Sequence, residues 1–151
     1  MEYTLASLAQ EQSELGLSVF NYDFIWDLGQ RLQARAKAEK APVAITISHG
    51  TDLVFCTVLE GATVLNLDWA ARKRAVAHQF HRSSLSLRIE AEEEGHDFNK
   101  RYLLPDSHYF ATGGGVPLMG KNGTYLGAVA VSGLPDVEDH RMIVETLRDM
   151  L

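Results

Sequence analysis

Residues 109–140 read YFATGGGVPLMGKNGTYLGAVAVSGLPDVEDH and carry most of the information about the fold. Two extended segments, Val116–Met119 and Tyr125–Ser132, flank Asn122–Gly123, a strong β-hairpin signal because a type I′ turn needs positive φ at both central residues. The glycines of Gly113–Gly115 precede the hairpin and can expose backbone N–H groups to an anion or a flat ligand. A helix follows it, with carboxylates and a histidine in its first turn. Strand pairing would bring the glycines and this turn together in one polar mouth, which predicts binding.

The segments outside this stretch alternate between helical and extended patterns. Apolar residues at spacings of three and four predict a helix over Tyr22–Glu39, with Asn21 as its N-cap. Hairpin-linked strands favour an antiparallel sheet covered by helices, so the chain is predicted to be an α+β, three-layer domain. The remaining expected helices cover residues 4–14, Asn66 or Asp68 to about Phe80, Ser83–Ser84 to Glu93 and Val137–Leu151, and the remaining expected strands cover Val43–Ser48, Leu53–Leu59 and Tyr109–Thr112.

Composition indicates one globular domain over residues 1–151, of which residues 1–16 form a helical N-terminal extension. Fourteen basic and twenty acidic residues give a formal charge of -6. This balance argues against a nucleic-acid partner, because Arg72–Arg74 is the only basic cluster. No signal peptide and no apolar run of about 20 residues is recognisable, so we expect no membrane span and a cytoplasmic location.

Two further features have an ordinary structural interpretation. Cys56 is the only cysteine, which excludes an internal disulfide, and its apolar surroundings, Leu53–Leu59, predict a buried structural thiol. The acidic run Glu90–Glu94 is expected to be a solvated helix end.

Several motifs along the chain resemble those of one known family. They are Leu28–Gly29, Pro42–Ile45, Trp69 with Arg72–Lys73, Phe80 with Ser83–Ser84, Gly113–Pro117, and Val131–Pro135 followed by Glu138–His140. From about residue 16 onward the chain resembles the HbpS-like and GlcG-like haem-degrading-domain superfamily, in particular its small branch of uncharacterised single-domain proteins. The resemblance implies a profilin-like fold with a five-stranded antiparallel sheet between helices, and homo-oligomers. Some relatives bind haem, so haem is a possible cofactor by resemblance, while the small branch has no settled activity.

The candidate ligand site is assembled from both halves of the predicted mouth. Trp69, Arg72 and Lys73 share one helix face by their spacing, which suits an anion or stacking of the arginine on the tryptophan. A histidine at the mouth could contact a ligand or a metal. The predicted ligand-binding residues are Gly113, Gly114, Gly115, Ser132, Gly133, Glu138, His140, Trp69, Arg72 and Lys73.

Each of these features also has a purely structural interpretation. The glycines could simply form a tight corner, the acidic first turn could be a solvated cap, and Trp69 could lie in the core. His78 and His81 are spaced for one helix face, but no third ligand is spaced to complete a metal site, so the metal stays unknown.

The sequence shows neither a nucleophile elbow nor a phosphate loop, so no catalytic residue is predicted and the question of an enzyme stays open. The leading hypothesis is an oligomeric small-molecule-binding protein with a planar or anionic ligand. The alternative is a structural or adaptor module that acts through oligomerisation and a protein partner.

Overall fold

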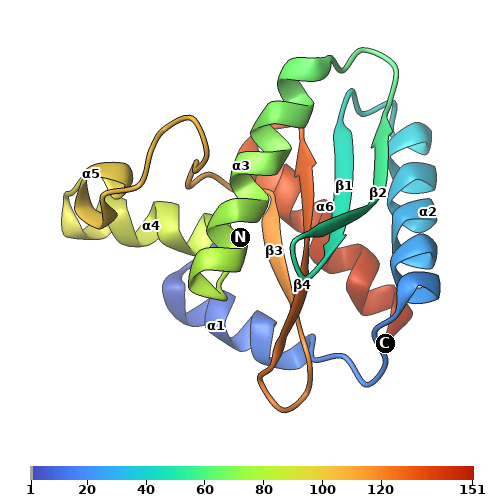
Figure 1. Cartoon of the computed structure of the whole chain (residues 1–151), viewed down its shortest axis with the longest axis horizontal. Helices are drawn as coiled ribbons and strands as arrows, with labels where there is room; N and C mark the ends of the chain where they lie inside the picture. Colours follow the sequence, from blue (N-terminus) through green and yellow to red (C-terminus); the bar gives the residue numbers. More distant parts are fainter. Residues whose placement is uncertain (1) are drawn as a thin grey trace.

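A computed structural model describes residues 2–151 (Figure 1). Four strands form one antiparallel sheet in the order β2-β1-β4-β3, and helices cover both of its faces. The α+β prediction is therefore confirmed. In chain order the elements are α1 (Leu5–Glu14), α2 (Tyr22–Ala38), β1 (Ala44–His49), β2 (Asp52–Val58), α3 (Val64–Phe80), α4 (Ser84–Glu94), α5 (Phe98–Tyr102), β3 (Gly115–Met119), β4 (Tyr125–Ser132) and α6 (Asp136–Met150).

The predicted fifth strand, Tyr109–Thr112, is wrong, and the sheet has four strands rather than five. This segment is hydrogen-bonded to two helices instead of to a neighbouring strand. The Phe110 N–H donates to the carbonyl of Arg72 in α3 at 3.4 Å, and the Thr112 side chain donates to Asp136 in α6 at 3.1 Å. The segment therefore crosses between two helices, which leaves β3 as an edge strand of the sheet.

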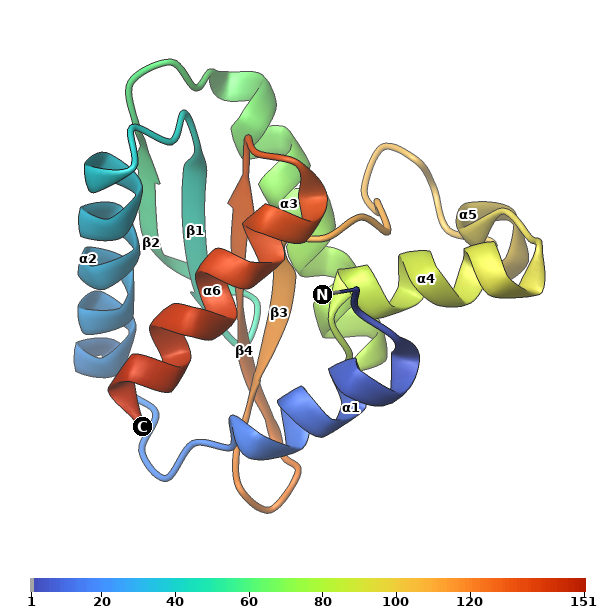
Figure 2. The same ribbon diagram turned by 180° about the vertical axis from the view of Figure 1, so that it is seen from behind.

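The main hydrophobic core lies between one face of the sheet and the helices α2 and α6. Figure 2 shows α6 crossing in front of the strands and α2 beside β2. Ile45 and Ile47 of β1 and Val129 and Val131 of β4 point toward these helices and are fully buried. Their alternation with small or polar neighbours is the period-2 pattern of a strand. One face of the sheet is therefore bulky and apolar.

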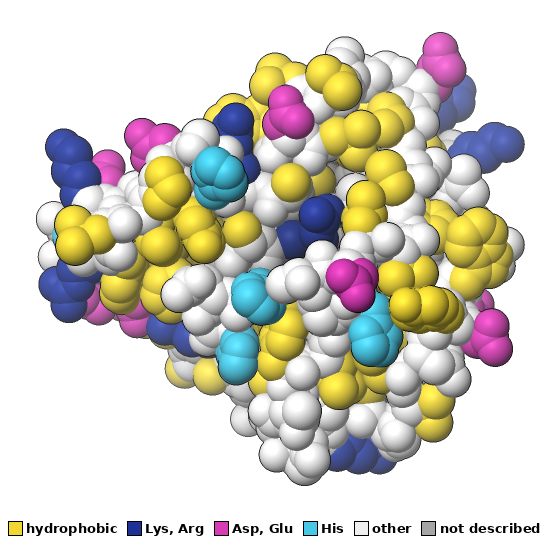
Figure 3. All heavy atoms as spheres, viewed as in Figure 1, with side chains coloured by type: hydrophobic (Ala, Val, Ile, Leu, Met, Phe, Trp, Pro, Cys, Tyr) yellow, Lys and Arg dark blue, Asp and Glu magenta, His cyan; other side chains and the backbone are white. Residues whose placement is uncertain are grey.

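The opposite face carries small side chains, and this allows α3 to pack closely against it. A Cβ placed on Gly115 would lie 2.4 Å from the carbonyl oxygen of Lys73, so only glycine permits this approach. Ala128 and Ala130 of β4 are likewise buried there. The space-filling view of this side shows a hollow with basic side-chain atoms inside it and histidines nearby (Figure 3).

The local signals for helix ends and turns are largely reproduced. Asn21 caps α2. The predicted start of α3 is late, because Thr63 is its N-cap and Asn66 provides the reciprocal bond of a capping box. The Asn122–Gly123 hairpin is present, yet only Gly123 has positive φ, at 85°. The turn is therefore not type I′.

The structure corrects the expectation for Cys56, which is exposed. The apolar run around it forms β2, an edge strand whose side chains are covered on one face only, so alternate residues reach the surface. In the acidic run, Glu92, Glu93 and Glu94 are exposed as expected, whereas Glu90 is half-buried and paired with Arg82 at 3.1 Å.

Candidate functional site

The glycine loop is held by hydrogen bonds from within the protein. The Gly113 N–H donates to Asp136 Oδ2 at 2.9 Å, and the Gly115 N–H donates to Ser84 Oγ at 2.8 Å. The Gly114 carbonyl accepts from the N–H of Val131 at 2.8 Å. Two of the loop's three N–H groups are thus already paired, and all three glycines are buried. The loop joins β3, β4, α4 and α6 rather than lining an open mouth.

A buried ion pair lies directly against this loop. Lys73 Nζ donates to Asp139 Oδ2 at 3.0 Å and to the carbonyl of Val131 at 3.1 Å. The Asp139 carboxylate also accepts from the N–H groups of Gly133 at 3.2 Å and Leu134 at 3.0 Å. The side chains of Lys73 and Asp139 are only 4% and 1% exposed. The pair joins α3, β4 and α6 at the start of the last helix.

Burial acts on both ions of this pair. It lowers the pKa of Lys73, and the attraction of Asp139 opposes that shift only in part. It raises the pKa of Asp139, against the pull of Lys73 and of the backbone N–H groups. In each ion, the loss of hydration disfavours the charged form and the attraction of the partner favours it, which is the usual situation of a buried ion pair.

His140 lies on a different side of α6 from the glycine loop. Its Nε2 lies 2.7 Å from Glu11 Oε1 of α1, and its ring meets the edge of Tyr3 at a centroid distance of 5.0 Å. The side chain is 2% exposed, and Nδ1 has no hydrogen-bond partner among the described residues. Glu138 is exposed and pairs with Arg141, whereas Ser132 is buried in β4. The structure thus separates His140 from the glycines.

Trp69 and Arg72 form a stacked pair at the outside of α3. The Arg72 guanidinium lies 4.7 Å from the Trp69 ring centroid, and Phe110 approaches the same ring at 4.5 Å. Arg72 Nε also donates to the carbonyl of Ser107 at 3.3 Å. Of the predicted residues, Lys73 joins the glycines in the buried cluster, whereas Trp69 and Arg72 stay half-buried near the surface.

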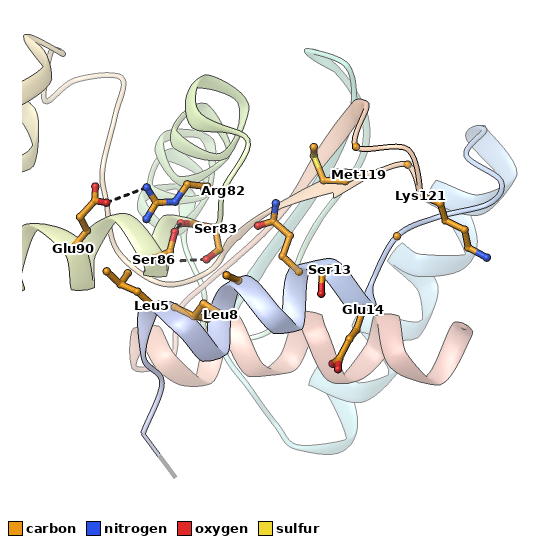
Figure 4. Close-up of a pocket in the computed structure, with 15 residues that line it drawn as sticks. Leu5, Leu8, Ser13, Glu14, Arg82, Ser83, Ser86, Glu90, Met119 and Lys121 are labelled. Atoms are coloured by element: carbon orange, nitrogen blue, oxygen red, sulfur yellow. Dashed lines mark hydrogen bonds and ion pairs between the residues drawn. The ribbon is translucent and has the colours of Figure 1, made fainter.

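A large hollow lies elsewhere, between α1, the start of α4 and the β3–β4 hairpin, with a volume of about 730 Å³ (Figure 4). We call it the α1 groove. Sequence patterns do not reveal it, because its walls come from three segments that only the fold brings together. It is lined by Leu5, Leu8, Ala9, Gln12, Ser13, Glu14, Gly16, Arg82, Ser83, Ser86, Glu90, Met119, Gly120, Lys121 and Gly123.

Two other kinds of site are absent from residues 2–151. No group of three or more His, Cys, Asp or Glu side chains is placed to hold a metal ion there. Within the same part of the chain, no helix is both long enough and apolar enough to cross a membrane.

Asp136 gives the glycine loop a pH-dependent anchor. Burial raises the pKa of its carboxyl, but the Gly113 N–H and the Arg88 guanidinium, 2.6 Å away, outweigh burial and hold the pKa below its usual range. A carboxylate of this kind stabilises the folded state above the unfolded-state pKa of about 4, and this stabilisation is lost as pH falls through the lower folded-state pKa.

We therefore expect Asp136→Asn to reduce stability near neutral pH and to flatten its decline below about pH 4. Urea unfolding between about pH 3 and pH 7 measures this slope. Exposed Glu138 is the matched control, and Glu138→Gln should leave the decline unchanged. An Asp136→Asn variant that loses stability in acid as steeply as the wild type would contradict the assignment.

The fold and the packing define the class of this protein, an α+β domain whose antiparallel sheet is covered by helices on both faces. The chain belongs to the HbpS-like family, since the family model described as haem degrading protein HbpS-like matches residues 20–148. That match covers most of the chain and confirms the resemblance drawn from its motifs.

Individual relatives agree with this membership. A UPF0303 protein of Paraburkholderia phymatum is 37% identical over 145 residues, which cover 96% of this chain and 88% of the relative. The crystal structure of Ybr137w protein is similar with a TM-score of 0.90 and 26% identity, over 99% of this chain and 88% of that one. The crystal structure of a PduOC:Heme complex has a TM-score of 0.73 at 18% identity, over 88% of this chain and 95% of that one, a likeness of fold.

Proposed function

We propose that this protein binds a planar, anionic small molecule in the α1 groove. The observation that carries the proposal is the size and lining of that groove: about 730 Å³ lies within the range of small-molecule sites, roughly 300–1,000 Å³. Leu5, Leu8 and Met119 supply apolar surface for a flat ligand, and Lys121 supplies a cation for an acidic group. Arg82 also lines the groove but is paired there with Glu90 at 3.1 Å. Figure 4 shows Leu5 and Leu8 on α1 with Met119 across the space from them, Arg82 turned toward Glu90, and Lys121 at the far end pointing outward.

Haem is the ligand suggested by the family to which the chain belongs and by the PduOC structure, which is a complex with haem. The groove fits part of the periphery of a haem, because its apolar wall suits the ring and Lys121 suits a propionate, whereas Arg82 is already paired with Glu90. It offers the iron no imidazole, since none of its lining residues is a histidine and His140 is paired with Glu11 behind α1. Bound haem would supply redox chemistry at its iron.

We expect filling of the groove to weaken binding of haemin, which serves as the planar anionic probe. Ala9 is an exposed alanine of α1 that lines the groove, so the indole of Ala9→Trp would occupy ligand space without disturbing the core. The affinity should fall at least about tenfold, since even about 1.4 kcal/mol of lost contact has this effect. Titration followed at the Soret band measures it.

The matched control is Ala6→Trp, because Ala6 is also an exposed alanine of the same helix but does not line the groove. It should bind haemin like the wild type, and His140→Ala should as well. Equal loss in both tryptophan variants, or non-saturating spectra throughout, would refute the proposal for haemin.

We further propose that the protein forms homo-oligomers in the cytoplasm, a setting that suits its single exposed thiol. Support for association comes from apolar side chains exposed on α2 and β2: Tyr22 is 59%, Trp26 55% and Leu53 54% exposed. Equilibrium sedimentation at micromolar concentration tests this, and a single-chain mass would refute it.

The alternative function, an adaptor module with a protein partner, uses the same kind of exposed surface. The Trp69 and Arg72 pair with Phe110 is a second such patch, open to a ligand or a partner. Loss of assembly without loss of haemin binding would separate the two functions.

A further inference from the structure

A second hollow lies on the other side of the molecule, between α3, the β1–β2 turn and β4. Its volume is about 190 Å³, and we call it the Arg74 hollow. Figure 3 views this side and shows basic atoms within a depression. None of its lining residues is acidic, and they are Ser48, Gly50, Thr51, Ala71, Arg74, Ala75, His78 and Tyr125.

The Arg74 guanidinium has no carboxylate partner among residues 2–151. Its side-chain hydrogen bond goes to the hydroxyl oxygen of Thr46 on β1, and it takes part in none of the ion pairs found within 4.0 Å. Burial lowers the pKa of Arg74, and the groups that oppose this are the Cys56 thiol and the Tyr125 phenol rather than an acid. A partly desolvated cation without a counter-ion is costly, so an anion in the hollow would be stabilised.

The groups around Arg74 favour an anion over a cation. The Thr46 hydroxyl of β1, which is buried and does not line the hollow, accepts a hydrogen bond from Arg74 and adds no negative charge. The Tyr125 hydroxyl donates to the Gly50 carbonyl at 3.3 Å, which fixes the phenol at the edge of the hollow. His78 lies against the Tyr125 ring at a centroid distance of 5.1 Å and adds a second nitrogen-bearing side chain.

The size of the hollow restricts what enters it. Its volume of about 190 Å³ is much smaller than the volume of the α1 groove, about 730 Å³. A hollow of this size suits a single acidic group with a short stem. A planar guanidinium binds such a group through two parallel N–H···O bonds when the group presents two oxygens. Carboxylate and phosphate both have this chemistry.

We propose that the Arg74 hollow is a binding site for a small oxyanion, a carboxylate or a phosphate group, held by the Arg74 guanidinium. The site is separate from the α1 groove, because the two share no lining residue. Its existence does not depend on whether haemin or any other molecule binds beside α1.

The test is a titration of the full chain with sodium phosphate and, separately, sodium acetate, followed by the amide signals of Gly50 and Thr51 in ¹H–¹⁵N NMR spectra. Sodium chloride at equal ionic strength controls for screening. We expect saturable shifts with the wild type and an affinity at least about tenfold lower with Arg74→Met, because a charge-assisted bidentate contact is lost. A larger response to phosphate or to acetate identifies which oxyanion the site prefers.

The matched control is Arg72→Met, because Arg72 lies two positions away on α3 and stacks on Trp69 outside the hollow. It should titrate like the wild type. Should Arg74→Met lose its folded spectrum, Arg74→Lys keeps the charge without the planar fork, and it should still bind more weakly than the wild type. Shifts that match those in chloride, or that survive both Arg74 substitutions unchanged, would overturn the proposal.

Discussion

We expect Lys73→Met to lower the free energy of unfolding by about 3–5 kcal/mol, the cost of breaking a buried ion pair from one side. The substitution removes the cation but leaves the Asp139 carboxylate 1% exposed, with only the N–H groups of Gly133 and Leu134 to balance its charge. It also leaves the carbonyl of Val131 without the Lys73 hydrogen bond. Urea unfolding followed by circular dichroism measures the change.

Arg31→Met is the matched control for this prediction. Arg31 pairs with Asp27 at 3.0 Å on the surface of α2, where both side chains are about half exposed, and its loss should cost about 0.5 kcal/mol or less. If Lys73→Met cost no more than Arg31→Met, the buried pair would not be holding α3 to α6. Adding Asp139→Leu to Lys73→Met should recover only part of the loss, because Gly133 and Leu134 would then lack an acceptor.

The second large effect is expected for Gly114→Ala. The residue has φ of +123°, which side-chain-bearing residues rarely adopt, and a Cβ there would lie 2.3 Å from the carbonyl oxygen of Val131 and 2.8 Å from Lys73 Nζ. Strain and overlap each cost roughly 1–3 kcal/mol, so a total of about 3 kcal/mol or more is expected. The loss of stability should be measurable by the same urea unfolding.

Gly50→Ala separates the two causes. Gly50 also has positive φ, at +58°, yet nothing lies within 4 Å of a Cβ added there, so this variant should show only the backbone cost of about 1–2 kcal/mol. Equal destabilisation by both substitutions would mean that the close approach of Gly114 to β4 and Lys73 contributes little. The comparison therefore tests whether the glycine loop serves to pack the fold tightly.

The sequence was most informative where neighbouring residues decide the structure. The spacing of Ile25, Leu28 and Leu32 predicted α2, and all three side chains are fully buried. Asn21 and Ser83 cap helices as expected, because a capping side chain bonds to an N–H only two or three residues ahead. Such signals depend on a few adjacent residues and are readable without knowledge of the fold.

The structure brings only part of the predicted site together, because the hydrogen-bond partners of several site residues are distant in sequence. Hairpin pairing does place Gly114 beside Val131, as the sequence indicated. His140, however, bonds to Glu11, 129 positions away, and Lys73 bonds to Asp139, 66 positions away. Nothing in the local pattern of either residue reveals which distant group will satisfy it, or that burial will remove it from a ligand's reach.

The sequence by itself determined the family, five of the six helices, the four strands of the sheet, and the hairpin that follows the glycines. Only the tertiary structure decided that residues 109–112 cross between helices, that Cys56 is exposed on an edge strand, and that Arg74 bonds to a hydroxyl on β1. The physical reason is that exposure and charge balance depend on which distant surfaces meet, whereas helix, strand and turn preferences depend on the residues next in the chain.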